Sequence, residues 1–115
     1  MGILMVTFSE VVKVRRTACK KCLSLIYDLP CKVDEKITSF LKSFGDPVYP
    51  LSTIRLLKIH SKDGYKINGK LGRKSIKLDL PKKLEHKDLN KESRKPEFEF
   101  YLKEWMSEKL DITIE

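Results

Sequence analysis

The feature that most constrains the fold is a run of three alternating segments within residues 54–80. In the middle segment Tyr65 and Ile67 alternate with Lys66 and Asn68. Successive side chains of a β-strand point to opposite faces of the sheet, so this alternation is typical of a strand with one buried and one exposed face. The third segment repeats the pattern, with isoleucine and leucine opposed to serine, lysine and aspartate.

Turn residues separate these three segments. Asp63-Gly64 lies between the first and the second, and Gly72-Arg73 lies between the second and the third. Glycine adopts the positive φ angles that tight hairpin turns require. Pro81 ends the third segment, because proline has no N–H for the strand ladder. The sequence therefore predicts an antiparallel, three-stranded meander.

Two amphipathic segments flank the meander and predict helices. Residues 34–44 carry an apolar stripe at helical spacing, and Gly45 and Pro47 follow where a helix would end. Residues 97–110 follow Pro96, a favoured residue at a helix start. The buried face of this second helix is expected to carry Phe98, Tyr101, Leu102, Trp105 and Met106, with Phe100 and Met106 directed partly elsewhere.

The chain ends are interpreted as strands, and one segment stays open. Residues 3–14 are rich in valine and threonine, and residues 111–115 alternate, as strands do. Residues 17–28 fit two structures, because Cys19, Cys22 and Ile26 recur at helical spacing while the alternation from Leu23 onward fits a short strand. The helix is the preferred interpretation.

This order of elements predicts one α+β domain spanning residues 1–115. The expected architecture is a ferredoxin-like (split β-α-β) sandwich, an antiparallel sheet with two amphipathic helices on one face. Residues 82–95 are interpreted as a polar, lysine-rich connector. A winged helix is the alternative, with residues 17–28 and 34–44 as its helix pair and the Asp63-Gly64 hairpin as its wing.

Positive charge is concentrated in the meander. Residues 55–83 hold ten Lys or Arg against only Asp63 and Asp79, which equals the net charge of +8 of the whole chain. A basic sheet face attracts polyanions, and lysines hold phosphates without reading bases. The alternative is a solvated lysine surface that prevents sheet edges from pairing. The candidate phosphate-binding residues are Arg55, Lys58, Lys66, Lys70, Arg73, Lys74 and Lys77.

We therefore expect a nucleic-acid-binding module, with RNA or single strands favoured over duplex. The aromatic platform of an RNA-recognition sheet is missing, because Tyr65 shares the apolar face. The alternative is a protein–protein interaction or regulatory subunit that forms a homodimer, or binds a protein partner, through the C-terminal helix or the sheet.

Cysteines define a third hypothesis, a metal-binding protein. Cys19 and Cys22 have the spacing of a zinc half-site, and Cys31 with His60 or His86 would complete a zinc set. Thiol redox chemistry and plain structural cysteines are the alternatives.

No spacing indicates a nucleophile and its base, so an enzyme is not favoured and no cofactor is expected. The apolar run within residues 3–8 is too short to span a membrane. We expect a cytoplasmic protein without membrane contact.

Overall fold

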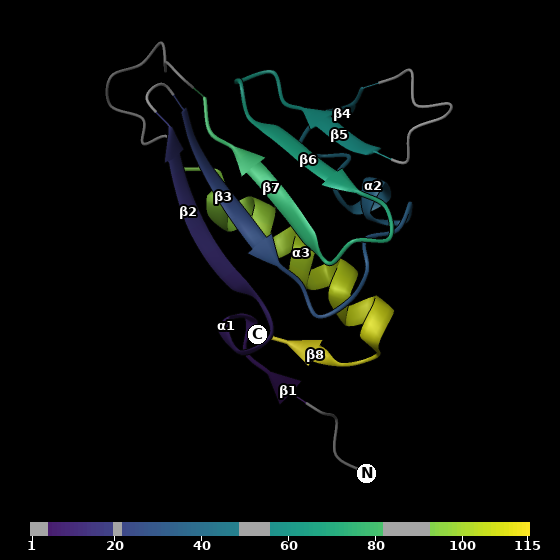
Figure 1. Ribbon diagram of the computed structural model, residues 1–115. Helices are drawn as coiled ribbons and strands as arrows, with labels where there is room; N and C mark the ends of the chain where they lie inside the picture. Colours follow the sequence, from purple (N-terminus) through teal and green to yellow (C-terminus); the bar gives the residue numbers. More distant parts are fainter. Residues whose placement is uncertain (1–4, 20–21, 49–55, 82–92) are drawn as a thin grey trace.

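The computed structural model describes residues 5–19, 22–48, 56–81 and 93–115. Strands and helices follow one another along the chain as Figure 1 labels them. They are β1 (Met5–Val6), α1 (Phe8–Val11), β2 (Lys13–Cys19), β3 (Cys22–Asp28), α2 (Ile37–Phe40), β4 (Asp46–Pro47), β5 (Leu56–His60), β6 (Lys66–Lys70), β7 (Ser75–Asp79), α3 (Lys95–Leu110) and β8 (Thr113–Ile114).

Six strands form the main sheet in the order β2-β3-β7-β6-β5-β4, and every neighbouring pair is antiparallel. The predicted meander is confirmed as β5, β6 and β7. Its two turns use Gly64 and Gly72, whose φ angles of 95° and 87° are the left-handed ones that glycine tolerates.

Residues 17–28 form most of a β-hairpin, so the preferred helix was wrong. Strands β2 and β3 pair over seven residues each, and β3 also pairs with β7. This segment forms a strand and not a helix because Leu25 and Tyr27 both enter the core. Ile26 between them points to the opposite face and is half-buried. The winged helix is thereby wrong too, since its first helix is this hairpin.

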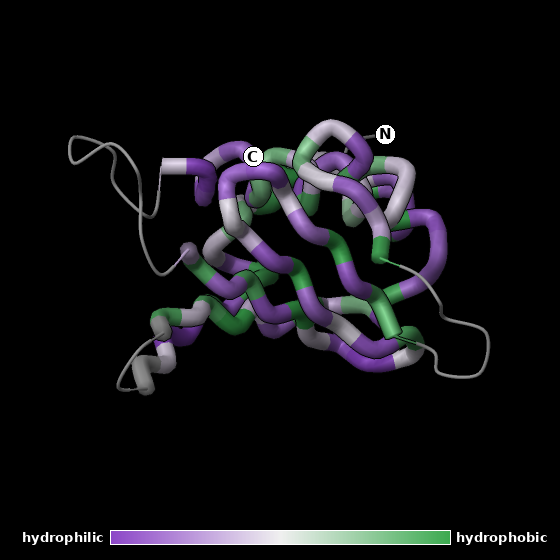
Figure 2. The backbone as a smooth tube through the Cα atoms, turned by 90° about the horizontal axis from the view of Figure 1, so that it is seen from above, coloured by the Kyte–Doolittle hydropathy of each residue, from purple (hydrophilic) through white to green (hydrophobic). Residues whose placement is uncertain are grey.

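The helices cover one face of the sheet, and the core lies between them. Figure 1 shows α3 behind the strands, and Figure 2 shows hydrophobic and hydrophilic residues alternating along them. The sheet contributes Leu25, Tyr27, Leu57, Ile59, Tyr65, Ile67, Ile76, Leu78 and Leu80, and α3 contributes Phe98, Leu102, Trp105 and Met106. Met106 is fully buried, which corrects the expectation that it points partly away from the core.

The helix predicted over residues 34–44 is reduced to the four residues of α2, with turns on both sides. Its expected stripe still packs inward, since Val33, Ile37, Leu41 and Phe44 are buried. Gly45 does not have the positive φ of a helix C-cap. Instead it lies against β5, where a Cβ atom would meet the His60 carbonyl oxygen at 2.8 Å.

The ferredoxin-like connectivity is not confirmed. It requires the terminal strand in the main sheet, whereas β8 pairs in parallel with β1 in a separate two-stranded sheet. The β2–β3 hairpin occupies the position beside β7, which closes that side of the meander. Asp111, with a φ of 52°, ends α3 and directs the chain toward β1.

The expected connector is shorter than predicted, because Lys95 already belongs to α3, and its residues 82–92 lie outside the described ones.

Candidate nucleic-acid interface

The strand register places basic side chains in rows on the face of the sheet opposite the helices, which we call the outer face. One row crosses five strands and contains Lys58, Asn68, Lys77, Ile26 and Arg15. Its three cations, Lys58 on β5, Lys77 on β7 and Arg15 on β2, are all exposed. One strand lies between each cation and the next. At about 4.8 Å between strands, their backbone positions are about 10 Å apart.

The next row contains Asp46, His60, Lys66, Asp79, Ser24 and Thr17. Here Lys66 is exposed and stands directly opposite Asp79, which is half-buried. Both rows belong to the outer face, because the residues between them on β3, β5, β6 and β7 enter the core.

The β6–β7 turn extends this positive surface at one end of the sheet. Lys70 ends β6, and Arg73 and Lys74 lie in the turn, all three exposed. Backbone hydrogen bonds from Leu29 to the Lys74 carbonyl and from Val33 to the Arg73 carbonyl hold the turn in place. The structure thus places six of the seven predicted phosphate-binding residues on or beside the outer face. The seventh, Arg55, lies outside the described residues.

Sequence reasoning missed Lys13 and Arg15, which β2 adds to the same face. Arg15 makes a two-pronged ion pair with Asp28, from Nε to Oδ2 at 2.8 Å and from Nη2 to Oδ1 at 3.1 Å. The alternation of residues 23–27 indicates β3 and hence its partner β2, but the helical spacing of the same segment was preferred over it. Residues 20–21 between them are both lysine, so the usual glycine or asparagine signal of a tight turn is absent.

Asp79 is a fixed carboxylate in the interior of this basic face. Its Oδ1 accepts a hydrogen bond from Ser24 Oγ at 2.6 Å, and its Oδ2 accepts one from Asn68 Nδ2 at 2.8 Å. The Lys77 ammonium lies 3.6 Å from Oδ1. The side chain of Asp79 keeps 27% of its surface exposed. Two neighbouring strands, β3 and β6, therefore hold this carboxylate in one orientation.

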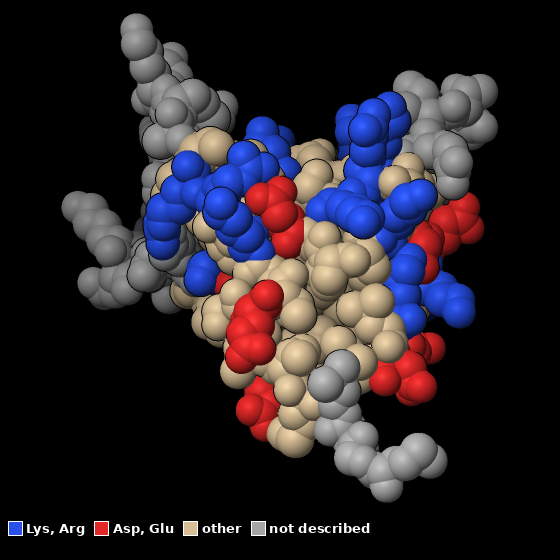
Figure 3. Space-filling model, turned by 60° about the horizontal axis from the view of Figure 1, so that its bottom comes forward, with Lys and Arg blue, Asp and Glu red and all other residues tan. Residues whose placement is uncertain are grey.

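Cations outnumber carboxylates on the outer face. Six strand residues are cationic, and three are acidic, Asp28, Asp46 and Asp79. Figure 3 shows Lys and Arg gathered in two groups, with acidic side chains between and below them. The six cations are Lys13, Arg15, Lys58, Lys66, Lys70 and Lys77. Among the described residues no Phe, Tyr or Trp projects from this face, because Tyr27 and Tyr65 are buried on the other one.

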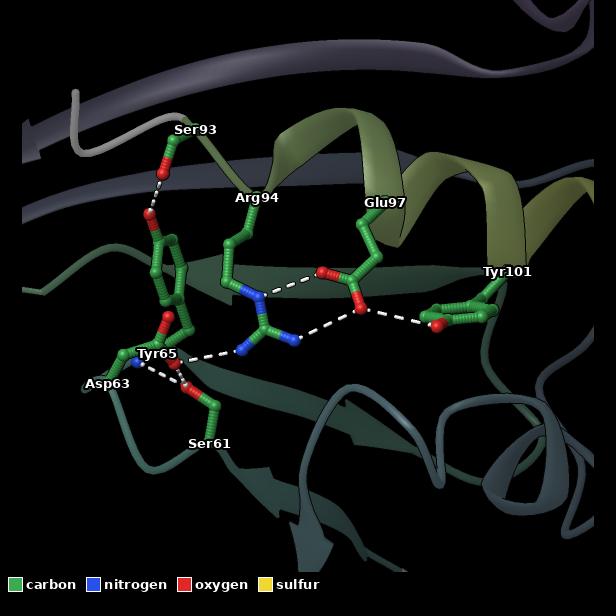
Figure 4. A network of polar contacts seen from close by, with 7 residues as sticks. All are labelled: Ser61, Asp63, Tyr65, Ser93, Arg94, Glu97 and Tyr101. Carbon is green, nitrogen blue, oxygen red and sulfur yellow. Dashed lines mark hydrogen bonds and ion pairs between the residues drawn. The ribbon is translucent and has the colours of Figure 1, made fainter. Parts of the chain in front are cut away.

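A polar network joins the β5–β6 turn to the start of α3 (Figure 4). Arg94 donates to Glu97 through Nε at 2.9 Å and Nη2 at 3.1 Å, and to Asp63 through Nη1 at 2.8 Å. Its guanidinium carbon also lies 4.1 Å from the centre of the Phe44 ring, a cation–π distance. The network holds the hairpin that carries Lys58 and Lys66 against the helix layer.

This network shifts the pKa values of both acids. The hydrogen bond from Arg94 lowers the pKa of Glu97 below its usual value. Burial would raise the pKa of Asp63, but hydrogen bonds from Ser61 and Arg94 outweigh burial and lower it. Both carboxylates are therefore stabilised in their charged form.

The three cysteines are not brought together. Cys19 and Cys22 are register partners at one end of the β2–β3 hairpin. Strand β3 spans about 20 Å at its usual rise and separates Cys22 from Cys31. Cys31 is buried in the core, and burial raises the pKa of its thiol. Raising the pKa disfavours the thiolate that binds metals.

Neither histidine changes this arrangement. His60 is exposed on β5, and His86 lies outside the described residues. Within the described ranges, no three His, Cys, Asp or Glu side chains are grouped as metal ligands.

Comparisons with protein-family models, curated proteins and solved structures found no match to this chain. In the part of the chain that the structure describes, no helix is long and apolar enough to cross a membrane.

Proposed function

We propose that this protein binds nucleic acid through the outer face, with RNA or single strands favoured over duplex. The observation that carries the proposal is the alignment of Lys58, Lys77 and Arg15 in one row of an open sheet face. Cations placed at regular intervals across an open sheet face suit a flexible chain of phosphates.

The proposed binding is to the backbone. Lysine is a point charge on a flexible stem and therefore contacts phosphates with little selectivity. The described outer face lacks the aromatic rings on which bases stack in many single-strand binders. Affinity should therefore depend strongly on salt and weakly on base sequence.

A charge-reversal variant with a matched control tests the proposal. Replacing Lys66, Lys70 and Lys77 by Glu should abolish binding to single-stranded RNA, because it removes three phosphate contacts and adds three repulsive charges. The control makes the same charge change at Lys36 and Lys42, on either side of α2, and at Lys103 on α3. It should bind like the wild type apart from a weak long-range effect. Equal affinity of the two variants would contradict the proposal.

A second candidate function is association through the outward side of α3. Phe100 lies there with 53% of its surface exposed. Single exposed apolar residues are common on monomers, so this observation favours the second function less than the rows of cations favour the first. The mass of the protein in light scattering, with and without Phe100→Ser, tests it. A monomeric wild type at all concentrations would exclude self-association.

A further inference from the structure

A nucleic-acid backbone lying on the outer face would meet carboxylates as well as the cations, and Asp79 is the one among the interior lysines. Asp79 lies on β7, an interior strand, opposite Lys66 and next to Lys77 on the same strand. Ser24 and Asn68 hold it by hydrogen bonds and cannot release it without leaving polar groups unpaired. Ser24 is 3% exposed, so its hydroxyl in particular has no access to solvent as a substitute partner.

Each oxygen of Asp79 still has capacity to accept a further hydrogen bond. A carboxylate offers about four lone-pair sites, and Ser24 and Asn68 fill one on each oxygen. The remaining sites are accessible, because the side chain is 27% exposed on the open face. The position therefore repels a phosphate and attracts a hydrogen-bond donor.

The two kinds of nucleic acid differ in the donors that their backbones carry. Phosphate and deoxyribose within a DNA strand have acceptors only, whereas each ribose of RNA has a 2′-hydroxyl that donates. Because the described outer face has no aromatic platform for bases, the backbone is the part of the ligand that faces Asp79.

We propose that Asp79 selects RNA over DNA by accepting a hydrogen bond from a ribose 2′-hydroxyl while the surrounding lysines hold the flanking phosphates. This selectivity rests on the proposed nucleic-acid binding and names its preferred substrate class. A DNA backbone offers this carboxylate no hydrogen-bond donor, so Asp79 only repels its phosphates.

Three oligonucleotides of one base test the proposal on the unmodified protein: oligouridine RNA, the same length of deoxyuridine DNA, and 2′-O-methyl oligouridine. The methyl ether keeps the ribose oxygen but removes the donated proton. A hydrogen bond to a charged group corresponds to about tenfold or more in affinity. The RNA should therefore bind about tenfold or more tightly than both others in fluorescence anisotropy titrations at low salt.

Two variants assign this preference to Asp79. Asp79→Ala should tighten DNA binding and bring the RNA-to-DNA affinity ratio close to one. Asp28→Ala is the matched control, because it removes the same charge from the same face, at the end of β3, and should leave the ratio unchanged. Fluorescence of the buried Trp105 checks that each variant is folded.

The outcomes separate the two proposals. Equal binding of all three oligonucleotides by the wild type, or a preference that survives in Asp79→Ala, would overturn the selectivity and leave nucleic-acid binding in place. Absence of binding to every oligonucleotide at low salt would overturn both. If Asp79→Ala is unfolded, the wild-type affinities for RNA and for its 2′-O-methyl form still test the selectivity. Equal affinities would overturn it.

Discussion

Arg94 connects three parts of the molecule through a single side chain. It pairs with Glu97 on its own helix, with Asp63 in the β5–β6 turn, and with the ring of Phe44 beyond α2. Its side chain is 22% exposed, so these interactions are only partly screened by water. A planar guanidinium with five donors suits this arrangement, which a lysine ammonium cannot reproduce.

Replacing Arg94 by Ala should lower the free energy of unfolding by about 2 kcal/mol, because it removes charged hydrogen bonds and a cation–π contact. Denaturant unfolding followed by the fluorescence of the single tryptophan measures the change. Arg15→Ala is the control, since Arg15 also makes a two-pronged ion pair but at an exposed position, where ion pairs contribute little. An equal loss in both variants would contradict the account of Arg94.

The lowered pKa values of Glu97 and Asp63 make the contribution of Arg94 depend on pH. A carboxylate with a lowered pKa in the folded state adds stability above its ordinary pKa, and loses it as the pH falls toward the lowered value. The stability difference between wild type and Arg94→Ala should therefore be largest near neutral pH and shrink on acidification. Unfolding curves at neutral and acid pH test this, and a difference that grows in acid would contradict it.

At the scale of elements, the chain entering β4 approaches β5 closely at a glycine. A Cβ atom on Gly45 would lie 2.8 Å from the His60 carbonyl oxygen, which is backbone and cannot rotate away. Gly45→Ala should therefore cost about 1–3 kcal/mol of stability, as overpacking does. Gly69→Ala is the control, because its Cβ would meet side chains at an ordinary 3.6 Å. A well-tolerated Gly45→Ala would show that the chain entering β4 can move away from β5.

The elements also show how far the sequence predicts this fold. The meander follows from alternation and from Gly64 and Gly72, because these signals are local. The β2–β3 hairpin was missed because cysteine and isoleucine positions also fit a helical period, and pairing with β7 is a long-range contact. The helix at residues 34–44 was overextended because its stripe fits a series of turns as well as a continuous helix.

The candidate site was predictable to the same extent. Lysines of the meander were assigned to the outer face from alternation alone, and the register places Lys58, Lys66 and Lys77 there. The addition of Arg15 and the hydrogen bonds of Asp79 depend on which strand lies beside β7, which no local pattern reveals.

At the scale of the whole molecule, the two sides of the sheet have different roles. The inner side packs against α2 and α3 and carries the stability of the domain, whereas the outer side carries an excess of positive charge. Substitutions of exposed outer-face lysines should therefore change binding with little effect on folding, as surface substitutions usually do.

Lysine footprinting tests the central claim most directly, because it locates a bound polyanion without changing the protein. The protein is acetylated briefly with and without saturating single-stranded RNA at low salt, and each lysine is quantified by mass spectrometry. We expect protection of Lys58, Lys66, Lys70 and Lys77, and unchanged modification of Lys36 and Lys42 on either side of α2. Protection that is equal at all exposed lysines, or confined to the helix side, would contradict binding through the outer face.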